Sequence, residues 1–347
     1  MTGSEVASPK VYVCVLSWNK IDNTLACLDS VFAQDYPNLR VVVVDNGSTD
    51  GSIEALRALG DRIELVQHGE NLGFTGGCNA GIRHALAHGA DYVWLLNNDS
   101  YCKPETLSLL VDYAEARPAI GLVAPIIADR RTGIDGFAIR RIDLATGQIE
   151  ATADPGEAEA MQERYPSQIM IKGTALLLKR GLIDRVGLLD DRFFAYCEDD
   201  DYCMRSAAAG FRAACVTAAR VYHDETTPAP GQPWRQPYAF YYAVRNGLLF
   251  WRKHAHGLAG WRYGRWHACT MFRVLARGGY GPNETEAFAD GLWSGLLGAT
   301  GRWDPSRASH RMPRLLRRLF VAKPAVVLGL LEADPRAVMR GFKRPLG

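Results

Sequence analysis

The chain has 347 residues, of which 48% are hydrophobic and 22% charged, and its net charge is +2. This balance is typical of a folded globular protein and excludes a disordered or fibrous chain. Its eight scattered cysteines form no C-x-x-C pair, which argues against a zinc ribbon and against a disulfide scaffold. Residues 1–10 contain no apolar signal core, and no run approaches the roughly 20 apolar residues that span a bilayer. We therefore expect a cytoplasmic protein whose membrane contact, if any, is peripheral.

The first half of the chain alternates strand-like and helix-like segments. Short apolar runs, typical of strands buried on both faces, occur at residues 11–16, 39–44, 63–67 and 91–96. Apolar residues at helical spacing lie between these runs, at residues 21–32, 53–59 and 78–86. A further helix is expected after Pro104, which suits a first turn. The order predicts an α/β fold with a mostly parallel central sheet and helices on both faces.

The second half is less regular. The pattern loosens between residues 129 and 166, where we expect a hairpin or a mobile loop. It resumes with a strand at 169–179, a helix at 180–186, a helix at 201–209 and a strand at 211–217. A linker follows, punctuated by Pro228, Pro230, Pro233 and Pro237. We therefore divide the chain into a first domain at residues 10–228 and a helical, basic C-terminal region at residues 229–347.

Polar motifs follow each of the first four predicted strands. Ligands bind at the carboxyl ends of the strands in parallel α/β sheets, and every one of these motifs falls at such an end. The motifs are Ser17-Trp18-Asn19, Asp45-Asn46-Gly47-Ser48, the glycine-rich stretch from Asn71 to Gly81, and Asn97-Asn98-Asp99. Glycines allow a phosphate to approach the backbone, and a helix N-terminus favours an anion. Turns, helix caps and tight helix packing are the alternatives, but four converging polar loops indicate a binding site.

The most unusual segment is the run of four carboxylates Glu198-Asp199-Asp200-Asp201, which follows an aromatic run and precedes Arg205 and His223. Adjacent carboxylates repel one another, so they suit a place where a cation, a proton or a developing positive charge is held. Together with Asp99 they predict a metal-assisted transferase that acts on a phosphorylated donor. A solvated acidic loop is the alternative.

In this order the motifs resemble the inverting family 2 glycosyltransferases of GT-A fold, particularly their bacterial rhamnosyltransferase-like branch. The resemblance covers roughly residues 10–250. Its segments are Val43-Val44-Asp45-Asn46-Gly47-Ser48, Asn71-Leu72-Gly73-Phe74, Gly76-Gly77, Asn79-Ala80-Gly81-Ile82, Leu95-Leu96-Asn97-Asn98-Asp99, Lys172-Gly173-Thr174-Ala175, Glu198-Asp199 with Asp201 and Arg205, His223, and Tyr241-Tyr242 with Arg245-Asn246. The resemblance implies a GT-A nucleotide-diphospho-sugar transferase domain followed by a region for acceptor, dimer or membrane contact.

The implied reaction moves a sugar onto a hydroxyl of a saccharide or lipid-linked saccharide acceptor in cell-surface polysaccharide assembly. The branch favours dTDP-L-rhamnose as the donor, and a UDP-sugar remains the alternative. A sugar nucleotidyltransferase would normally show a glycine-rich, basic loop after the first strand, which Ser17-Trp18-Asn19-Lys20 is not. A non-catalytic nucleotide-sugar-binding module would not need the acidic run.

The resemblance also implies roles for individual residues. Asp45 would read the pyrimidine ring of the donor. The other residues assigned to the donor pocket are Ser17, Trp18, Asn19, Asn46, Asn71, Gly73, Phe74, Asn79, Asn97, Asn98, Gly173 and Thr174. Asp99 holds the last place of the family's D-x-D motif and would bind Mg²⁺ or Mn²⁺, for which hard oxygen ligands are suited. His223 would complete that metal site, and a histidine satisfied at a strand end is the alternative.

An inverting transfer needs one base to take the proton from the acceptor hydroxyl as this attacks the anomeric carbon. The Glu-Asp pair assigns this role to Asp199, with Glu198 as the second choice. We expect Asp201 and Arg205 to form an ion pair that steadies the start of a helix. Arg245 is assigned either to the acceptor or to the structure.

The C-terminal segment is strongly basic. Residues 301–347 contain eleven Lys and Arg against three Asp and Glu, a net charge of +8. Basic and apolar residues alternate around Leu315 and Leu316 in a pattern that suits the anionic cytoplasmic face of an inner membrane. A helix packed on the catalytic domain with a solvated basic face is the alternative. The chain shows no nucleic-acid-binding motif, and the aromatic and Arg residues at 238–266 predict an acceptor wall or a homodimer interface.

Overall fold

The computed structural model describes residues 8–223, 236–278, 280–307 and 311–322. Linker residues Pro228, Pro230 and Pro233 and the basic residues after 322 lie outside this part of the chain. The chain separates into two compact units. The first contains residues 1–142, 149–191 and 198–225, and the second contains residues 143–148, 192–197 and 226–347.

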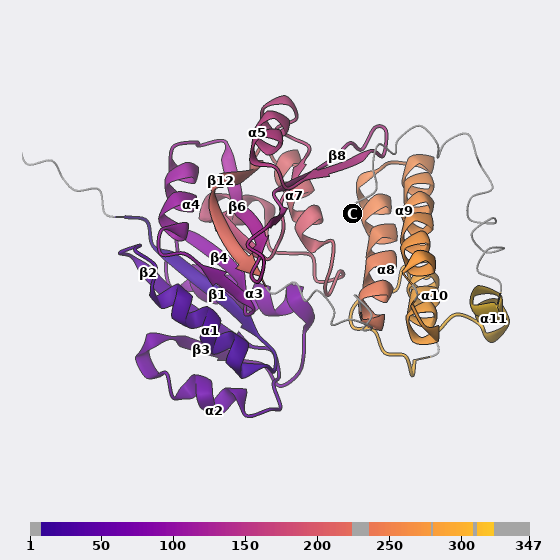
Figure 1. Cartoon of the computed structure of the whole chain (residues 1–347), viewed down its shortest axis with the longest axis horizontal. Coiled ribbons are helices and arrows are strands. Elements are labelled where there is room, and N and C mark those ends of the chain that lie inside the picture. The colour runs from indigo at the N-terminus through magenta and orange to yellow at the C-terminus, as the bar shows by residue number, and fades with distance from the viewer. Residues whose placement is uncertain (1–7, 224–235, 279, 308–310, 323–347) are drawn as a thin grey trace, which may run out of the picture. The chain divides into compact units, whose positions relative to one another are not determined.

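The first unit is built on a mixed sheet flanked by helices, as Figure 1 shows. In the described residues the sheet has nine strands, in the order β3-β2-β1-β4-β11-β6-β12-β5, with β7 paired to β6. They are β1 (Val11–Ser17), β2 (Leu39–Asp45), β3 (Glu64–Gln67), β4 (Tyr92–Asn97), β5 (Ser100–Cys102), β6 (Ile120–Asp129), β7 (Asp135–Phe137), β11 (Ala175–Lys179) and β12 (Arg212–His223). A second, three-stranded sheet has the order β10-β8-β9, with β8 at Ile139–Ile142, β9 at Ile149–Thr152 and β10 at Ile169–Met170.

The helices of this unit are α1 (Ile21–Phe32), α2 (Ser52–Arg57), the 3₁₀ turn η1 (Gly60–Arg62), α3 (Gly73–Ala87), α4 (Thr106–Glu115), α5 (Pro155–Arg164), α6 (Arg180–Val186) and α7 (Glu198–Ala208). The predicted parallel arrangement is confirmed for β3, β2, β1 and β4. Antiparallel pairing of β11 with β4 and β6 makes the whole sheet mixed. Apolar side chains of β1, α1 and α4, including Val13, Leu28 and Leu110, form the core.

Several predicted boundaries were wrong. Residues 129–166 contain β7, the predicted hairpin β8–β9 and helix α5, instead of a mobile loop. The predicted strand at 169–179 is broken between β10 and β11, because the Gly173 amide turns toward the Asp199 carboxylate. Strand β12 runs on to His223 through an irregularity between Val216 and Arg220. Pro104 precedes α4 by two residues and does not lie in its first turn.

The helix predicted at 78–86 begins earlier, at Gly73, so the first part of the glycine-rich stretch is helix and not loop. A Cβ atom at Gly81 would lie 1.9 Å from Cys14 Sγ, and one at Gly77 would lie 2.2 Å from Leu16 Cδ1. Helix α3 therefore packs so close to β1 that only glycine fits at these two positions without a shift of the neighbouring side chains. Tight helix packing, the alternative left open above, is what Gly77 and Gly81 provide.

The second unit is helical in its described residues. It contains α8 (Pro237–His254), α9 (Leu258–Arg277), α10 (Pro282–Leu297) and α11 (Arg314–Ala322). Pro237 lies in the first turn of α8 and not in the linker. Phe240, Phe272 and Phe288 are buried at the centre of this unit. None of the helices in the part of the chain described here is long and apolar enough to cross a membrane.

Helix α11 packs on its own unit and also exposes apolar residues. Phe320 is buried against Phe272 and Phe288. Arg317 donates to Asp290 at 2.7 Å and to Glu286 at 3.3 Å. Leu315, by contrast, is 75% exposed. Helix α11 therefore packs on the second unit and also leaves apolar side-chain surface exposed.

We expect Gly81→Ala to lower the free energy of unfolding by about 1–3 kcal/mol, the usual cost of overpacking a core. The added methyl group collides with Cys14, and urea unfolding measures the loss. The matched control is Gly181→Ala in α6, where a Cβ meets no atom within 4 Å. That change should stabilise the chain by up to about 1 kcal/mol through helix propensity. Equal effects of the two substitutions would contradict the close approach of α3 to β1.

Candidate active site

Asp45 ends β2 at the carboxyl edge of the sheet and is completely buried. Its Oδ2 accepts hydrogen bonds from the backbone amides of Gly47, at 3.2 Å, and Ser48, at 3.1 Å. Its Oδ1 is also buried but has no hydrogen-bond partner among the described residues. A buried carboxylate oxygen without a donor is costly, so this atom is well placed to accept a hydrogen bond from a ligand.

The loop after β1 is tied to the loop after β2. The Asn19 amide donates to Ser48 Oγ at 2.8 Å, and Asn19 Oδ1 accepts from the Thr49 amide at 2.9 Å. Ser17 Oγ is buried against Thr24 Oγ1 at 3.1 Å. The Trp18 side chain is half exposed. The polar residues thus shape the loop, and the indole of Trp18 is the group left available for contact with a ligand.

Asn46 and Asn71 hold the start of α3. Asn46 Nδ2 donates to Asn71 Oδ1 at 3.2 Å and to the Gly73 carbonyl at 3.0 Å, while its Oδ1 accepts from the Leu72 amide at 3.0 Å. Asn71 Oδ1 also accepts from the Gly73 amide at 2.8 Å. The side-chain amides of both asparagines thus position the backbone of the helix N-terminus.

Asn79 lies apart from these groups. It is buried on α3, and its Nδ2 donates to the Leu189 carbonyl at 2.9 Å and to Asp191 Oδ1 at 2.6 Å. Its Oδ1 accepts from the Leu189 amide at 3.0 Å. The structure uses the Asn79 amide to anchor the segment after α6, so Asn79 is not brought to the donor pocket that the sequence predicted.

Asp99 and His223 come together because β12 pairs with β5 in a register that places His223 opposite Ser100. Asp99 Oδ1 lies 2.9 Å from His223 Nε2, and Asn97 Nδ2 lies 3.4 Å from the same nitrogen. The first contact does not have the geometry of a hydrogen bond. Asp99 Oδ1 and His223 Nδ1 are buried atoms that find no hydrogen-bond partner in the described residues. A carboxylate and an imidazole that lie side by side in this way are suitable ligands for a divalent cation.

Asn98 does not join this pair: its Nδ2 donates to Thr24 Oγ1 at 2.9 Å. The backbone of Asn97 is held by the Thr174 carbonyl, which accepts its amide at 3.0 Å. The neighbouring Gly173 amide donates to Asp199 Oδ2, also at 3.0 Å. The segment Gly173-Thr174 therefore connects the end of β4, which leads to Asp99, with the start of α7.

The four carboxylates lie in the first turn of α7, so the predicted helix start at Asp201 was too late. The positive end of the helix dipole favours negative charge at this position. Asp200 pairs with Arg140, and Asp201 pairs with Arg205 Nε at 2.8 Å. Arg205 also donates to the carbonyls of residues 186 and 188. The pairing of Asp201 with Arg205 is the one that the sequence led us to expect.

Glu198 and Asp199 differ in their surroundings. Burial, followed by the adjacent Asp199 carboxylate, raises the pKa of Glu198 well above its usual range. Glu198 Oε2 is buried, and nothing in the described part of the chain bonds to it. Asp199 is partly exposed, and its Oδ1 accepts from the Asp200 amide at 2.8 Å. Asp199 is therefore the carboxylate of this pair that is both fixed and accessible.

Phe74 and Gly173 lie beside Asp199. A Cβ atom at Gly173 would stand 3.4 Å from Asp199 Cβ and 3.6 Å from Phe74 Cε1. Glycine at this position leaves room next to the carboxylate. Of the predicted donor residues, Phe74, Gly173 and Thr174 are thus grouped with the acidic run, whereas Asp45, Asn46 and Asn71 are grouped at the end of β2.

Arg245 and Asn246 of α8 hold the segment 192–197 within the second unit. Arg245 is 1% exposed and donates to the carbonyls of Arg192, Phe193 and Gly301. Asn246 Nδ2 donates to the carbonyls of Phe193, Ala195 and Tyr196 at 2.6–2.9 Å. Of the two roles left open for Arg245, these contacts support the structural one.

Two residues that support the candidate site were not predicted from the sequence. Asn246 was part of a recognised motif, but no local pattern shows that its partners are carbonyls some fifty residues earlier. Arg140, the partner of Asp200, lies in the stretch where the pattern loosens. An arginine on a short strand with no strong periodicity carries no signal that could have identified it.

The family model described as glycosyl transferase family 2 matches residues 12–187, more than half of the chain. The chain belongs to this family. This confirms the family that the motifs predicted.

Among its relatives is an N-acetylglucosaminyl-diphospho-decaprenol L-rhamnosyltransferase of Mycobacterium tuberculosis, to which this chain is 30% identical over 203 residues. The aligned region covers 53% of this chain and 66% of the relative. This family 2 chain is 25% identical over 249 residues to the dTDP-rhamnosyl transferase RfbF of Shigella flexneri, covering 70% and 80% of the two chains. It is 29% identical over 227 residues to the galactofuranosyltransferase GlfT1 of Mycobacterium tuberculosis, covering 63% and 72%.

Solved structures of similar fold include the mannosyltransferase PcManGT from Pyrobaculum calidifontis in complex with GDP-Man and Mn²⁺. Its TM-score is 0.53 at 20% identity, over 95% of this family 2 chain and 86% of PcManGT. Residues 1–349 of S. aureus TarS in complex with UDP-GlcNAc give a TM-score of 0.54 at 14% identity, over 83% and 81% of the two chains. These likenesses confirm the predicted GT-A fold.

The acidic run predicts a measurable dependence of stability on pH. Burial raises the pKa of Asp200 from 3.8 to about 6, although Arg140 opposes this. The folded chain therefore keeps a proton that the unfolded chain releases, and the stability that this proton contributes is lost as the pH rises from about 4 through about 6. Asp200→Asn lacks this proton. Between about pH 4 and about pH 7.5, its free energy of unfolding should rise relative to wild type by about 2 kcal/mol.

The comparison is made by urea unfolding at several pH values, with Asp22→Asn as the control. Asp22 also lies in the first turn of a helix, but its side chain is exposed. Its substitution should shift stability by a nearly constant amount across this range. If Asp200→Asn follows the same flat course as the control, the carboxyl group of Asp200 does not hold the proton.

Proposed function

We propose that this chain is an inverting, metal-dependent glycosyltransferase that moves a sugar from a nucleoside diphosphate to an acceptor hydroxyl. Membership of family 2 supports sugar transfer in general. The observation that carries the proposal is the link through Gly173-Thr174, which joins the strand leading to Asp99 with Asp199. A site for the leaving group and a site for the base are thereby fixed to one short segment.

Asp99 and His223 would hold Mg²⁺ or Mn²⁺. Two observations support this assignment: Asp99 Oδ1 is buried without a hydrogen bond, and it lies 2.9 Å from His223 Nε2. The cation, when bound, would offset the negative charge of the departing nucleoside diphosphate without a proton transfer. Asn97 and Asn98, in place of the acids of a D-x-D motif, leave Asp99 as the carboxylate of this loop.

Asp45 would recognise the base of the donor nucleotide. Its buried Oδ1 can accept the N3–H of a pyrimidine, and the half-exposed Trp18 is a surface on which a ring can stack. Thymine and uracil both carry this N–H, so Asp45 alone does not separate them. The likeness to the Shigella dTDP-rhamnosyl transferase supports dTDP-L-rhamnose. The galactofuranosyltransferase relative supports a different sugar. A UDP-sugar donor is the alternative.

Asp199 would be the general base. Two backbone amides, of Gly173 and Asp200, fix its carboxylate while its side chain stays partly exposed. Glu198 is less suited, because burial raises its pKa and so favours the protonated form, which cannot accept a proton. In this scheme Asp199 takes the proton of the acceptor hydroxyl as the hydroxyl oxygen attacks the anomeric carbon.

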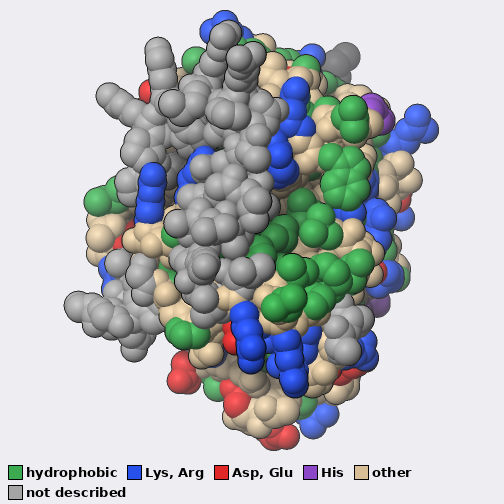
Figure 2. Space-filling model, turned by 90° about the vertical axis from the view of Figure 1, so that its right-hand side faces the viewer, with side chains coloured by type: hydrophobic (Ala, Val, Ile, Leu, Met, Phe, Trp, Pro, Cys, Tyr) green, Lys and Arg blue, Asp and Glu red, His purple; other side chains and the backbone are tan. Residues whose placement is uncertain are grey.

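The acceptor is proposed to be a lipid-linked saccharide, as in the name of the mycobacterial relative. The second unit contains a cavity of about 400 Å³ whose walls include Trp261 and Leu292, with Arg262 and Arg265 among its lining residues. On the face of the molecule in Figure 2, hydrophobic side chains gather beside Lys and Arg. Exposed Leu315 on the basic helix α11 adds a surface for an anionic membrane, on the cytoplasmic face of the inner membrane. The homodimer stays a prediction.

Nucleotide binding tests the donor assignment. Thermal stability measured with dTDP, UDP, GDP, CMP and NAD should rise with dTDP, and more so when Mn²⁺ is present. A ligand at a hundred times its Kd adds about 2.7 kcal/mol. Asp99→Ala should remove the part that depends on Mn²⁺, whereas Asp61→Asn, a change at an exposed acid, should retain it. A shift with NAD alone, or an Mn²⁺ effect that survives Asp99→Ala, would overturn the proposed donor and metal site.

Turnover tests the base. Asp199→Asn should lower kcat by about 10²–10⁴, the usual contribution of a general base, while the Kd for dTDP stays nearly unchanged. The readout is release of dTDP from dTDP-L-rhamnose, with and without an N-acetylglucosaminyl-diphospho-polyprenol acceptor. Glu198→Gln is the matched control, because it imitates the protonated acid and should keep most of the activity. Near-normal turnover in Asp199→Asn, or a larger loss in Glu198→Gln, would show that Asp199 is not the base.

A further inference from the structure

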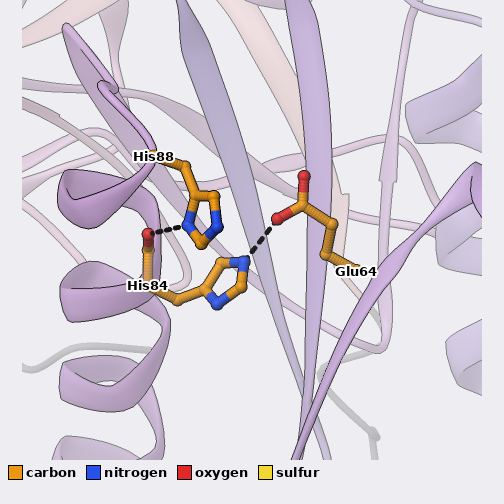
Figure 3. A group of neighbouring side chains, drawn as sticks. All are labelled: Glu64, His84 and His88. Atoms are coloured by element: carbon orange, nitrogen blue, oxygen red, sulfur yellow. Dashed lines mark hydrogen bonds and ion pairs between the residues drawn. The ribbon is translucent and has the colours of Figure 1, made fainter.

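A second group of side chains with metal-binding chemistry lies away from Asp99 and His223. Glu64 begins β3, His84 lies in the last turn of α3 and His88 directly follows that helix (Figure 3). One ligand atom from each residue lies within 4.8 Å of the other two. Helix α3 starts at the ligand-binding edge of the sheet. At about 1.5 Å per residue, His84 is displaced by about 16 Å from its first residue, Gly73.

The two histidines face the same way because they are four residues apart on a helix. Their rings stack with centroids 4.3 Å apart. His88 Nδ1 lies 2.8 Å from the His84 carbonyl, and since a carbonyl only accepts, Nδ1 must carry the proton. His88 Nε2 is then the nitrogen with the free lone pair. Histidines that bind metals usually have this arrangement, in which the other ring nitrogen donates to a carbonyl or carboxylate.

Glu64 is oriented by a comparable outer contact. Its Oε1 accepts a hydrogen bond from the hydroxyl of Tyr12 at 3.0 Å, and its Oε2 contacts His84 Nε2 (Figure 3). Tyr12 is buried on β1, so the hydroxyl comes from a fixed position in the sheet. The partners that commonly support metal ligands are therefore in place for both Glu64 and His88.

We propose that Glu64, His84 and His88 bind a first-row divalent transition metal, with Zn²⁺ as the ion that best matches the ligands. Two imidazoles and one carboxylate form a known zinc ligand set, which leaves a fourth position for water. Such a set is unlike the oxygen-rich sites that Mg²⁺ requires. The ion would replace the direct contact of His84 with Glu64. It would tie α3 to β3, which lies at the edge of the sheet.

The charge of Lys10 opposes a cation at this place. The Lys10 ammonium donates to the His88 carbonyl at 2.8 Å and lies 5.6 Å from the centre of the Tyr12 ring. Its repulsion of a bound ion is screened by water at this partly exposed place, so it lowers the affinity without excluding the ion. Lys10→Met removes the charge and gives the experiment a variant in which binding should tighten.

Titration calorimetry of the full chain with Zn²⁺ tests the proposal. All variants carry Asp99→Ala, so that the proposed diphosphate-metal site does not contribute, and the buffer contains a non-thiol reductant. The background variant should bind one Zn²⁺, and His88→Ala or Glu64→Gln should weaken binding by at least about tenfold, since loss of an outer partner alone costs about 10–100-fold. His256→Ala, at an exposed histidine of the second unit, should leave binding unchanged.

Hydrogen exchange gives a second readout that does not depend on activity. Zn²⁺ should slow exchange of the amides of β3 and of the last turn of α3 in the background variant, but not in His88→Ala. Absence of Zn²⁺ binding, or binding that His88→Ala and Glu64→Gln leave unchanged, would overturn the proposal. So would weaker binding in Lys10→Met. In any of these cases the contact of His84 with Glu64 is an ordinary ion pair.

Discussion

The start of α7 is the constraint around which the candidate active site is organised. Four carboxylates begin this helix, and the fold gives each one different surroundings: Asp200 faces Arg140 of β8, Asp201 faces Arg205 and Asp199 accepts the Gly173 amide, while Glu198 is buried. Without these separate partners, mutual repulsion would oppose the burial of the helix start. The Gly173 amide that reaches Asp199 lies in the break between β10 and β11.

The elements that could be predicted are those with a strong local signal. Apolar runs identified β1, β2 and β4, and polar residues directly after them identified Asp45 and Asp99, because strand ends in a parallel sheet share one edge. The start of α3 could not be predicted, since glycines look like a loop until their contact with β1 is known. Arg140 could not be found for a similar reason: its meaning depends on Asp200, which is distant in the sequence.

The second unit stabilises a segment whose backbone is otherwise unfavourable. Phe194, Tyr196 and Cys197 have positive φ angles, which cost residues other than glycine about 1–3 kcal/mol each. The buried side chains of Arg245 and Asn246 offset this cost by donating to the carbonyls between residues 192 and 196. The pair on α8 therefore fixes the backbone of this segment within the second unit.

The contact of Gly81 with Cys14 has an evolutionary consequence. Residues 14 and 81 are far apart in the sequence, yet their side chains would occupy the same volume in the core. A lineage can enlarge the residue at 81 only after the residue at 14 has become smaller. We therefore expect the two positions to vary together among related chains, as should positions 77 and 16.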